Sequence, residues 1–239
     1  MAEIQYSFAR YEKKYFLTPQ QQAAVLEGIR PYTQPDEYGS YTICNLYYDT
    51  DDWRLIRASI EKPTYKEKLR VRSYGVPEPD GTVFVEIKKK CRGMVYKRRI
   101  CADVRLAAKD LPRAAALQGG QIGREIGWFL HTYPVSPKVF IAYDRTAFAG
   151  LDDPSLRITF DRNIRWRDTA LDLRQGSTGA PLGPEGKVLM ELKLPGVCPL
   201  WLSRLLSEVG AFPTSFSKYG AYYCEHIIKE IPKEARYSA

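Results

Sequence analysis

A segment with a cation at every second residue constrains the fold of this chain more than any other feature. The segment covers residues 65–74, and its cations are Lys66, Lys68, Arg70 and Arg72. A β-strand sends alternate side chains to opposite faces, so these four cations would share one face and apolar residues such as Leu69 the other. The pattern therefore predicts a strand with one basic face.

The same alternation recurs in three further segments, at residues 82–90, 94–103 and 187–194. The alternating charges there are Glu86, Lys88 and Lys90, then Lys97 and Arg99, then Glu191 and Lys193. Flat sheets do not bury charged faces, whereas a closed barrel does so if its lumen is wet and holds a ligand. We therefore predict a barrel with a basic interior and a covered exterior.

Helices are expected between these strands, which makes the fold class α+β. Thr18, Pro19 and Gln21 form a capping-box pattern at the start of a helix that ends near residues 28–30. We expect further strands and helices, with strands at 8–17, 41–48, 138–148 and 156–161, and helices at 49–60, 106–133 (one or two), 199–209 and 217–231. No segment has the composition of an interdomain linker, so residues 1–239 are predicted to form a single domain.

The charge balance favours a polyanionic ligand. The 239 residues contain 36 Lys and Arg against 28 Asp and Glu, a net charge of +8. Nucleic acid, phosphates or an anionic membrane surface would each fit such an excess. Five widely spaced cysteines and two histidines argue against zinc or histidine-rich metal sites and favour reduced thiols in a cytoplasmic protein. Neither a signal peptide nor a membrane-spanning segment is expected.

A lumen lined by many cations would repel itself unless polyanions neutralise it. Phosphate chains fit best, because Arg binds phosphoryl oxygens with two donors and Lys adds a mobile point charge. The candidate lining residues are Lys14, Arg70, Arg72, Lys88, Lys97, Arg99, Arg145, Arg157, Lys193 and Lys218. The same repulsion predicts that Arg70→Ala or Arg145→Ala abolishes triphosphate binding without loss of stability.

Few carboxylates lie among these cations. Glu12, Glu86 and Glu191 alternate with Lys or Arg, and each could either pair with its neighbours or help to hold a divalent cation. Glu191 is the first candidate for a metal ligand and Glu86 the second. Residues 119–123 are Gly-rich but lack the following Lys-Ser/Thr of a P-loop, which argues against a P-loop kinase.

At these residues the chain resembles the catalytic domain of the VTC (vacuolar transporter chaperone) polyphosphate polymerases, members of the triphosphate tunnel metalloenzyme superfamily. Nine short segments occur in the same order along almost the whole chain. They are residues 11–15, 45–50, 68–75, 85–88, 97–99, 143–148, 157–161, 191–193 and 216–220. Each segment alone is a weak signal, and their common order is specific.

The resemblance implies a closed eight-stranded antiparallel β tunnel with helices packed around it. It implies transfer of the γ-phosphoryl of ATP to a growing inorganic polyphosphate chain, with Mn²⁺ or Mg²⁺ as the ion. Six residues would act in catalysis: Arg70, Arg72, Lys97, Arg145, Lys193 and Lys218. Five would bind phosphate: Lys14, Lys88, Arg99, Tyr143 and Arg157. Glu191, and with less support Glu86, would hold the metal.

One position departs from the wider superfamily. Many tunnel triphosphatases and CYTH-type cyclases begin with Glu-x-Glu-x-Lys, and this chain has Arg10-x-Glu12-x-Lys14. A cation in place of the first glutamate favours the polymerase over the runner-up, an inorganic or nucleotide triphosphatase. A third hypothesis is a non-catalytic module that binds polyphosphate or a nucleotide. Nucleic acid is not expected as a partner, and the sequence does not predict the oligomeric state.

Overall fold

The computed structural model describes residues 11–61, 63–92 and 94–229, so Arg10 lies outside the described residues. The described chain groups into two compact units. The first unit contains residues up to Tyr41, Asp144–Asn163 and Pro184–Phe216, and the second contains Thr42–Tyr143, Ile164–Gly183 and residues from Ser217 onward. The single domain expected from the sequence stays a prediction.

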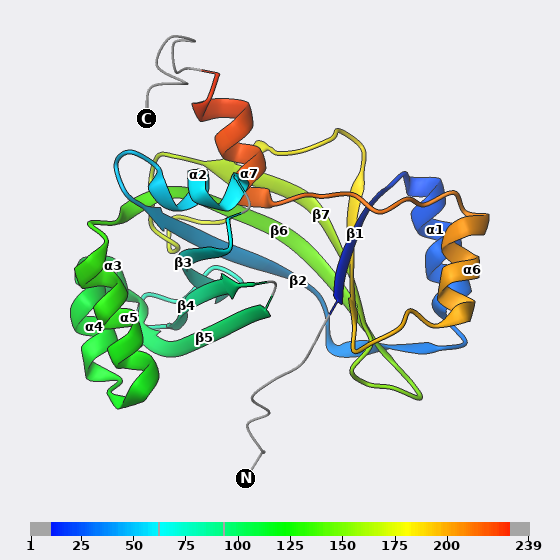
Figure 1. The fold of residues 1–239 in the computed structure, drawn as a ribbon, viewed down its shortest axis with the longest axis horizontal. Helices are drawn as coiled ribbons and strands as arrows, with labels where there is room; N and C mark the ends of the chain where they lie inside the picture. Colours follow the sequence, from blue (N-terminus) through cyan, green and yellow to red (C-terminus); the bar gives the residue numbers. More distant parts are fainter. Residues whose placement is uncertain (1–10, 62, 93, 230–239) are drawn as a thin grey trace. The chain divides into compact units, whose positions relative to one another are not determined.

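Nine strands of the described chain form an antiparallel sheet (Figure 1). They are β1 (Tyr11–Leu17), β2 (Thr33–Asp49), β3 (Tyr65–Tyr74), β4 (Thr82–Cys91), β5 (Met94–Asp103), β6 (Ser136–Gly150), β7 (Arg157–Arg167), β8 (Ala180–Pro181) and β9 (Val188–Leu194). Their order is β1-β9-β7-β6-β2-β3-β4-β5, and the two-residue β8 pairs with β7. The α+β class and the antiparallel sheet are confirmed, and closure of the sheet into a tunnel stays a prediction.

The helices lie between and after these strands. They are α1 (Pro19–Ile29), α2 (Arg54–Ile60), α3 (Val104–Lys109), α4 (Leu111–Leu117), α5 (Gly120–Thr132), α6 (Leu200–Glu208), α7 (Lys218–Tyr222) and the π-helix η1 (Tyr223–Ile227). The predicted capping box is confirmed, because Thr18 Oγ1 accepts from the Gln21 amide at 3.1 Å and Gln21 Oε1 accepts from the Thr18 amide at 2.9 Å. Among the described helices, none is long and apolar enough to cross a membrane.

The core of the first unit lies between its strands and the helices α1 and α6. Leu17 on β1, Ile158 on β7 and Leu192 on β9 are fully buried there, together with Ile29 and Leu202 from the two helices. These residues alternate along their strands with Lys14, Arg157, Glu191 and Lys193. Burial of the apolar face therefore directs the charged side chains to the opposite face.

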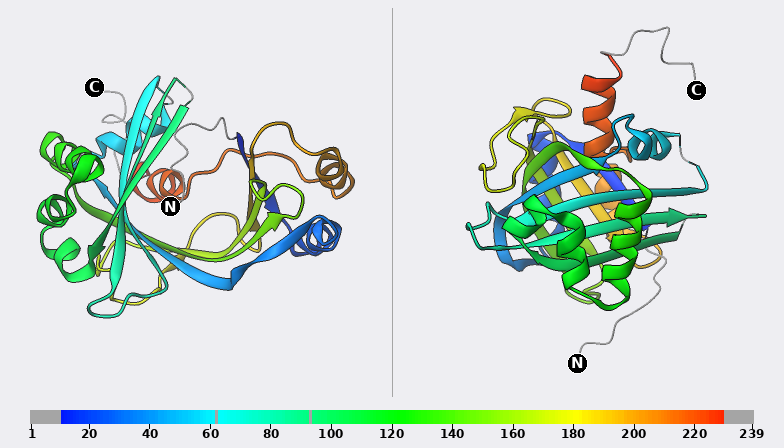
Figure 2. Two further views of the ribbon diagram at one scale, coloured as in Figure 1. Left: turned by 90° about the horizontal axis from the view of Figure 1, so that it is seen from below. Right: turned by 90° about the vertical axis from the view of Figure 1, so that its left-hand side faces the viewer.

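The core of the second unit lies between β3–β5 and the helices α3–α5. Leu69, Val85 and Ile100 come from successive strands and pack with Ile126 and Phe129 of α5. Figure 2 shows α3–α5 on one face of these strands and α7 on the opposite face. The predicted division of β3 into an apolar and a basic face is confirmed, since Leu69 and Val71 are buried against the helices.

Three predicted helices differ from the structure. The helix predicted at 49–60 begins only at Arg54, and Asp49 is the last residue of β2. The Asp49 carboxylate accepts from the amides of Leu55 and Ile56, each at 2.9 Å, and so caps α2 from outside the helix. The segment 106–133 forms three helices instead of one or two, since Asp110 ends α3 and caps α4. The predicted helix at 217–231 becomes a π-helix after Tyr222.

Candidate functional site

The register of β3, β4 and β5 aligns the predicted cations in rows across three strands. Lys68 lies opposite Lys88, which lies opposite Lys97. The face consists of the alternate residues of β3 from Lys66 to Arg72 and the residues opposite them on β4 and β5. Its charged members are one carboxylate, Glu86, and eight cations, namely Lys66, Lys68, Arg70, Arg72, Lys88, Lys90, Lys97 and Arg99. Like charges directly opposite each other are destabilising, so a bound polyanion would stabilise this face. We call these nine residues the basic face of β3–β5.

Glu86 is the centre of the basic face. Its carboxylate is 2% exposed and lies 2.7 Å from Arg70 Nη2, 3.0 Å from Lys97 Nζ and 3.9 Å from Arg72 Nε. Burial alone would raise the pKa of Glu86, but the charges of Arg70, Arg72 and Lys97 outweigh burial and lower it to about 2. The carboxylate therefore stays ionised and holds three cations of the face in place.

In Lys97 burial and the neighbouring positive charges disfavour the charged form, in contrast to Glu86. Its burial and the positive charges of Arg70 and Arg72 lower its pKa to about 8, although the attraction of Glu86 acts against this shift. An anion placed next to Lys97 would favour the ammonium form and raise its pKa again. Binding of an anion at this position would therefore be accompanied by proton uptake at Lys97.

Arg72 is positioned by two polar residues of the same unit. Its Nε donates to Asn45 Oδ1 at 2.9 Å, and its Nη2 donates to the Tyr143 hydroxyl at 3.3 Å. Asn45 is itself fully buried and donates to the carbonyl of Ile141 at 3.0 Å. Lys218 Nζ lies 4.1 Å from the centre of the Tyr143 ring. The predicted site residues Arg72, Tyr143 and Lys218 are therefore brought together.

A second chain of contacts joins Arg70 to the start of α7. Arg70 Nη1 donates to the Tyr47 hydroxyl at 3.3 Å, and the Tyr47 ring stacks on Tyr219 with centroids 4.7 Å apart. Tyr219 donates to the buried carboxylate of Asp49 at 2.8 Å. Since Tyr219 follows Lys218 directly, these contacts hold the Lys218 backbone close to the basic face.

The first unit carries the second group of predicted residues, on β1, β9 and β7. Lys14 lies opposite Glu191, and Lys193 lies opposite both Glu12 and Arg157. Lys193 Nζ is 3.7 Å from Glu191 Oε1. Lys14 Nζ donates to the carbonyl of Phe216 at 2.6 Å, and Arg157 pairs with Asp36 at 3.3 Å. Opposite charges therefore face each other between β1 and β9, whereas Lys193 and Arg157 put two cations opposite each other between β9 and β7.

Arg145 is engaged by a buried partner that the sequence reasoning missed. Its Nε and Nη2 donate to the two oxygens of Asp161 at 2.6 and 2.8 Å. Asp161 is fully buried, and the Arg145 side chain is 11% exposed. A two-donor pair of this kind is strong and directional. It fixes the guanidinium and occupies two of its five donors.

The carboxylates available to a divalent cation are few. In the ranges that the structure describes, no three His, Cys, Asp or Glu side chains come together as a metal-binding group. Glu12 and Glu191 share one face of the β1–β9 pair as diagonal neighbours. Mg²⁺ is commonly held by one or two carboxylates together with substrate phosphates, so this donor set fits an ion that the substrate helps to bind. Glu86 fits less well, because three cations surround it.

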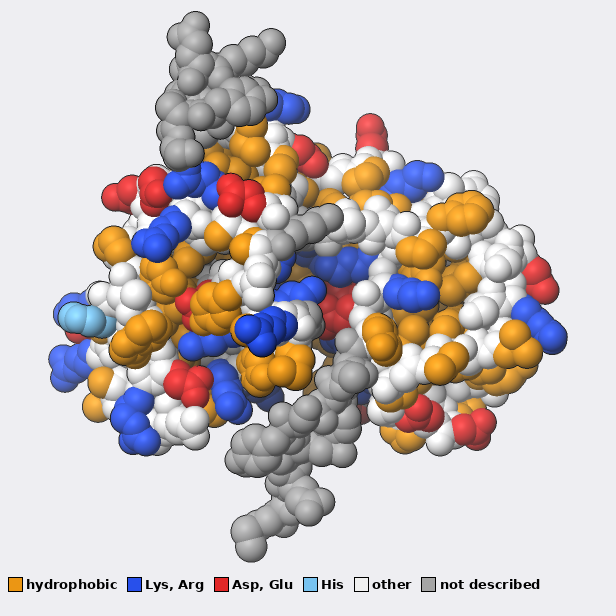
Figure 3. All heavy atoms as spheres, in the orientation of Figure 1, with side chains coloured by type: hydrophobic (Ala, Val, Ile, Leu, Met, Phe, Trp, Pro, Cys, Tyr) orange, Lys and Arg blue, Asp and Glu red, His pale blue; other side chains and the backbone are white. Residues whose placement is uncertain are grey.

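The predicted site residues thus fall into two groups, one in each unit. The second unit brings together Arg70, Arg72, Glu86, Lys88, Lys97, Arg99, Tyr143 and Lys218. The first unit brings together Lys14, Arg157, Glu191 and Lys193, with Arg145 on Asp161. Asn45 and Tyr47 were missed as site residues, although their alternation in the 41–48 strand would have placed both on one face. In Figure 3, Lys and Arg side chains are visible over both units.

Comparison with known proteins then decides the family. A model of the VTC domain matches residues 9–225, which is most of the chain. The chain belongs to the VTC domain family. No curated protein matches this VTC domain. The predicted family is therefore confirmed, and with it a place among phosphate-handling proteins.

Solved structures of the triphosphate tunnel type share the fold of this VTC domain. One is a proposed adenylyl cyclase from Hippeastrum, described as having a dominant triphosphatase activity, with a TM-score of 0.55, 14% identity and coverage of 90% of this chain and 95% of that one. Another is a proposed adenylate cyclase from Bacillus halodurans, with a TM-score of 0.54, 11% identity and coverage of 90% and 96%. At this identity the likeness concerns the fold alone.

Proposed function

We propose that this VTC domain is a metal-dependent polyphosphate polymerase that transfers the γ-phosphoryl of ATP to the end of an inorganic polyphosphate chain. The observation that carries the proposal is the basic face of β3–β5, where eight cations share one face with the single carboxylate of Glu86. A face with this excess of positive charge suits a long polyanion better than a single small anion. Family membership supports the same substrate class.

In the proposed reaction, a terminal oxygen of the polyphosphate attacks the γ-phosphorus of ATP. The bond from the γ-phosphorus to the β–γ bridging oxygen breaks, and ADP leaves with that electron pair. Phosphoryl transfer needs in-line positioning and neutralisation of charge rather than covalent chemistry from the protein. Arg70 and Arg72, held by Glu86, Tyr47 and Asn45, would supply oriented donors to the phosphoryl oxygens.

The lysines would add charge that adapts to the substrate. Lys97 would become fully protonated when phosphate binds, and Lys218 would approach the same anion from the start of α7. In the first unit, Glu191 and Glu12 would hold Mn²⁺ or Mg²⁺ next to Lys14 and Lys193. When bound, the ion would neutralise charge on the phosphate oxygens that lie beside β1 and β9.

A triphosphatase is the second candidate. The Hippeastrum protein with the same fold is described as a triphosphatase, and the pair Glu12 and Glu191 gives this chain carboxylates that a hydrolytic metal site would also use. In that case water, rather than polyphosphate, would attack the γ-phosphorus. The basic face would then bind only the triphosphate of the substrate.

Product analysis separates these functions. The purified protein is incubated with ATP and Mn²⁺, and the products are resolved on a gel before and after exopolyphosphatase treatment. Long chains that the exopolyphosphatase removes identify a polymerase, and orthophosphate alone identifies a triphosphatase. Tight binding of tripolyphosphate without any turnover would identify a binding module. Glu191→Gln should abolish either activity, and Glu208→Gln, an exposed carboxylate at the end of α6, is the matched control.

A further inference from the structure

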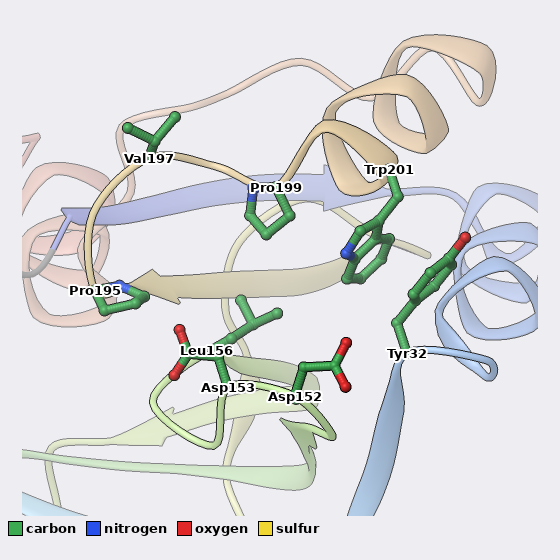
Figure 4. A pocket seen from close by; sticks show the side chains of 9 residues that line it. Tyr32, Asp152, Asp153, Leu156, Pro195, Val197, Pro199 and Trp201 are labelled. Atoms are coloured by element: carbon green, nitrogen blue, oxygen red, sulfur yellow. The ribbon is translucent and has the colours of Figure 1, made fainter.

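A pocket in the first unit has no part in the proposed phosphate chemistry. Its volume is about 240 Å³, and its lining includes Tyr32, Asp152, Asp153, Pro195 and Trp201. The lining comes from the residue before β2, the β6–β7 turn, the segment that connects β9 to α6 and the first turn of α6. Figure 4 shows Trp201 and Tyr32 at one end of this pocket and Pro195 at the other.

The aromatic end of the pocket is a stacked pair of rings that is partly exposed to solvent. The rings of Tyr32 and Trp201 stack with centroids 4.1 Å apart and an interplanar angle of 9°. Tyr32 is 42% exposed, and apolar side chains of the same segments also face solvent, with Val197 94% and Leu200 64% exposed. Hydrophobic side chains are visible on the surface around α1 and α6 in Figure 3. This surface would release water on contact with a partner.

The floor of the pocket is acidic, in contrast to the net charge of +8 on the whole chain. Asp153 stabilises the β6–β7 turn, since its carboxylate accepts from the Ser155 amide at 2.9 Å. Asp152 makes no hydrogen bond or ion pair with any described residue, and in Figure 4 its carboxylate points toward the stacked rings. A carboxylate beside aromatic rings is the environment that a guanidinium prefers, through two-donor hydrogen bonds and cation–π contact.

The size of the pocket selects among cationic ligands. Pockets for small molecules usually measure roughly 300–1,000 Å³, and this one is smaller, so it suits a single long side chain. The exposed apolar residues around it would then contact the neighbours of that side chain. Arginine is frequent among the residues that dominate protein interfaces.

We propose that this pocket, hereafter the Trp201 pocket, docks an extended segment of a partner protein through one arginine flanked by apolar residues. The arginine would lie between Asp152 and Trp201, and Val197 and Leu200 would cover the flanking apolar side chains. Proline on either side would suit the pocket, because extended proline-rich segments bind grooves lined by aromatic rings. The role is separate from phosphate binding, since no residue of the pocket belongs to the basic face.

The test uses the whole protein and a pair of synthetic peptides. Each is an acetylated and amidated nonapeptide of proline and leucine around one central residue, which is arginine in the first and glutamate in the second. Isothermal titration should give one site for the arginine peptide and no measurable heat for its twin. Asp152→Asn should weaken binding about fivefold and Trp201→Ala about tenfold. Asp80→Asn, an exposed carboxylate of the second unit, is the matched control and should change nothing.

Four results would overturn the proposal. The first is equal binding of the two peptides, or none by either. The second is binding that Asp152→Asn leaves unchanged, and this variant lies on an exposed side chain, so it remains a fair test if Trp201→Ala misfolds. The third is N-acetylarginine amide binding as tightly as the peptide, which would make the pocket a site for a small cation. The fourth is self-association in sedimentation that Trp201→Ala abolishes, which would assign the pocket to a second copy of this chain.

Discussion

Arg70 and Glu86 form the central ion pair of the basic face, with both Nε and Nη2 of the guanidinium 2.7 Å from one carboxylate oxygen. Glu86 is 2% exposed and Arg70 23% exposed, so the pair is partly shielded from water. The pair leaves most of the surrounding positive charge uncompensated. If this face binds phosphate as proposed, phosphate affinity and fold stability depend on the same residues.

Glu86→Gln should destabilise the protein by roughly 3 kcal/mol, because it leaves Arg70 and Lys97 without their buried counter-charge. Thermal or urea unfolding in phosphate-free buffer measures this loss. Tripolyphosphate should restore much of the stability, since it replaces the missing negative charge. Glu27→Gln, which removes an exposed pair with Arg30, should cost less than about 1 kcal/mol.

The stability that Glu86 contributes should also depend on acid pH. Its pKa is lowered from 4.5 to about 2, so the ionised carboxylate stabilises the fold fully above pH 4.5 and loses this effect as the pH falls toward 2. The difference in unfolding free energy between the wild type and Glu86→Gln should therefore shrink over that range. A difference that stays constant from pH 6 to pH 3 would refute the assignment.

Lys97 should couple phosphate binding to proton uptake. Because its pKa is about 8 in the free protein, much of the amine is neutral at pH 8.5, and a bound anion would protonate it. Calorimetric titration with tripolyphosphate at pH 8.5, in two buffers of different ionisation enthalpy, gives the number of protons taken up. Lys97→Gln should take up fewer protons than the wild type, and protonation of tripolyphosphate itself cancels in that comparison. Equal uptake by both proteins would be inconsistent with the proposed role.

Without ligand, the same lysine should affect stability at alkaline pH. A lowered lysine pKa means that the unfolded chain binds more protons between pH 8 and pH 10.5. The contribution of Lys97 to the free energy of unfolding should therefore rise with pH across this window. Lys97→Gln should lack this rise.

Arg145→Ala should lose stability, contrary to the expectation from charge repulsion alone. The substitution would remove the two-donor guanidinium from the fully buried Asp161, at a cost of roughly 3 kcal/mol. The double variant Arg145→Met with Asp161→Asn should recover part of this loss, because it removes both charges. Denaturant unfolding of the three proteins measures the effect, and a stable Arg145→Ala single variant would show that the pair contributes little.

Tyr219→Phe should weaken phosphate binding through the position of α7. The change removes the hydroxyl that donates to Asp49 at 2.8 Å, which should cost about 1–3 kcal/mol of stability. It should also lower tripolyphosphate affinity, since Lys218 directly precedes Tyr219. Tyr222→Phe is the comparison, because Tyr222 is equally buried and its hydrogen bond to Asp168 is long, at 3.4 Å. If both variants change tripolyphosphate affinity equally, Tyr219 does not position Lys218.

Local patterns predicted the strands well. When one face of a strand is buried, apolar residues alternate with charged residues along it, so both patterns indicate the same strand. The strands at 65–74 and 94–103 were predicted with their observed bounds, and the capping box at Thr18 placed α1.

Contacts that depend on strand register were not predictable in this way. Asp161 is paired with Arg145 from another strand, and nothing in its local sequence marks it as the partner. Asp49 caps a helix that begins five residues later, so the capping residue does not lie next to the helix start in the sequence. The rows formed by Lys68, Lys88 and Lys97 likewise follow from the pairing of strands and not from any one segment.

Tripolyphosphate binding at several salt concentrations tests the central claim most directly, namely that the basic face of β3–β5 binds phosphate chains. The proteins to compare are the wild type, Arg72→Ala, and Arg113→Ala as an exposed control on α4. We predict that Arg72→Ala lowers affinity at least about tenfold, the effect of losing one charged two-donor contact, and that Arg113→Ala matches the wild type. Equal affinities of all three proteins would contradict the account.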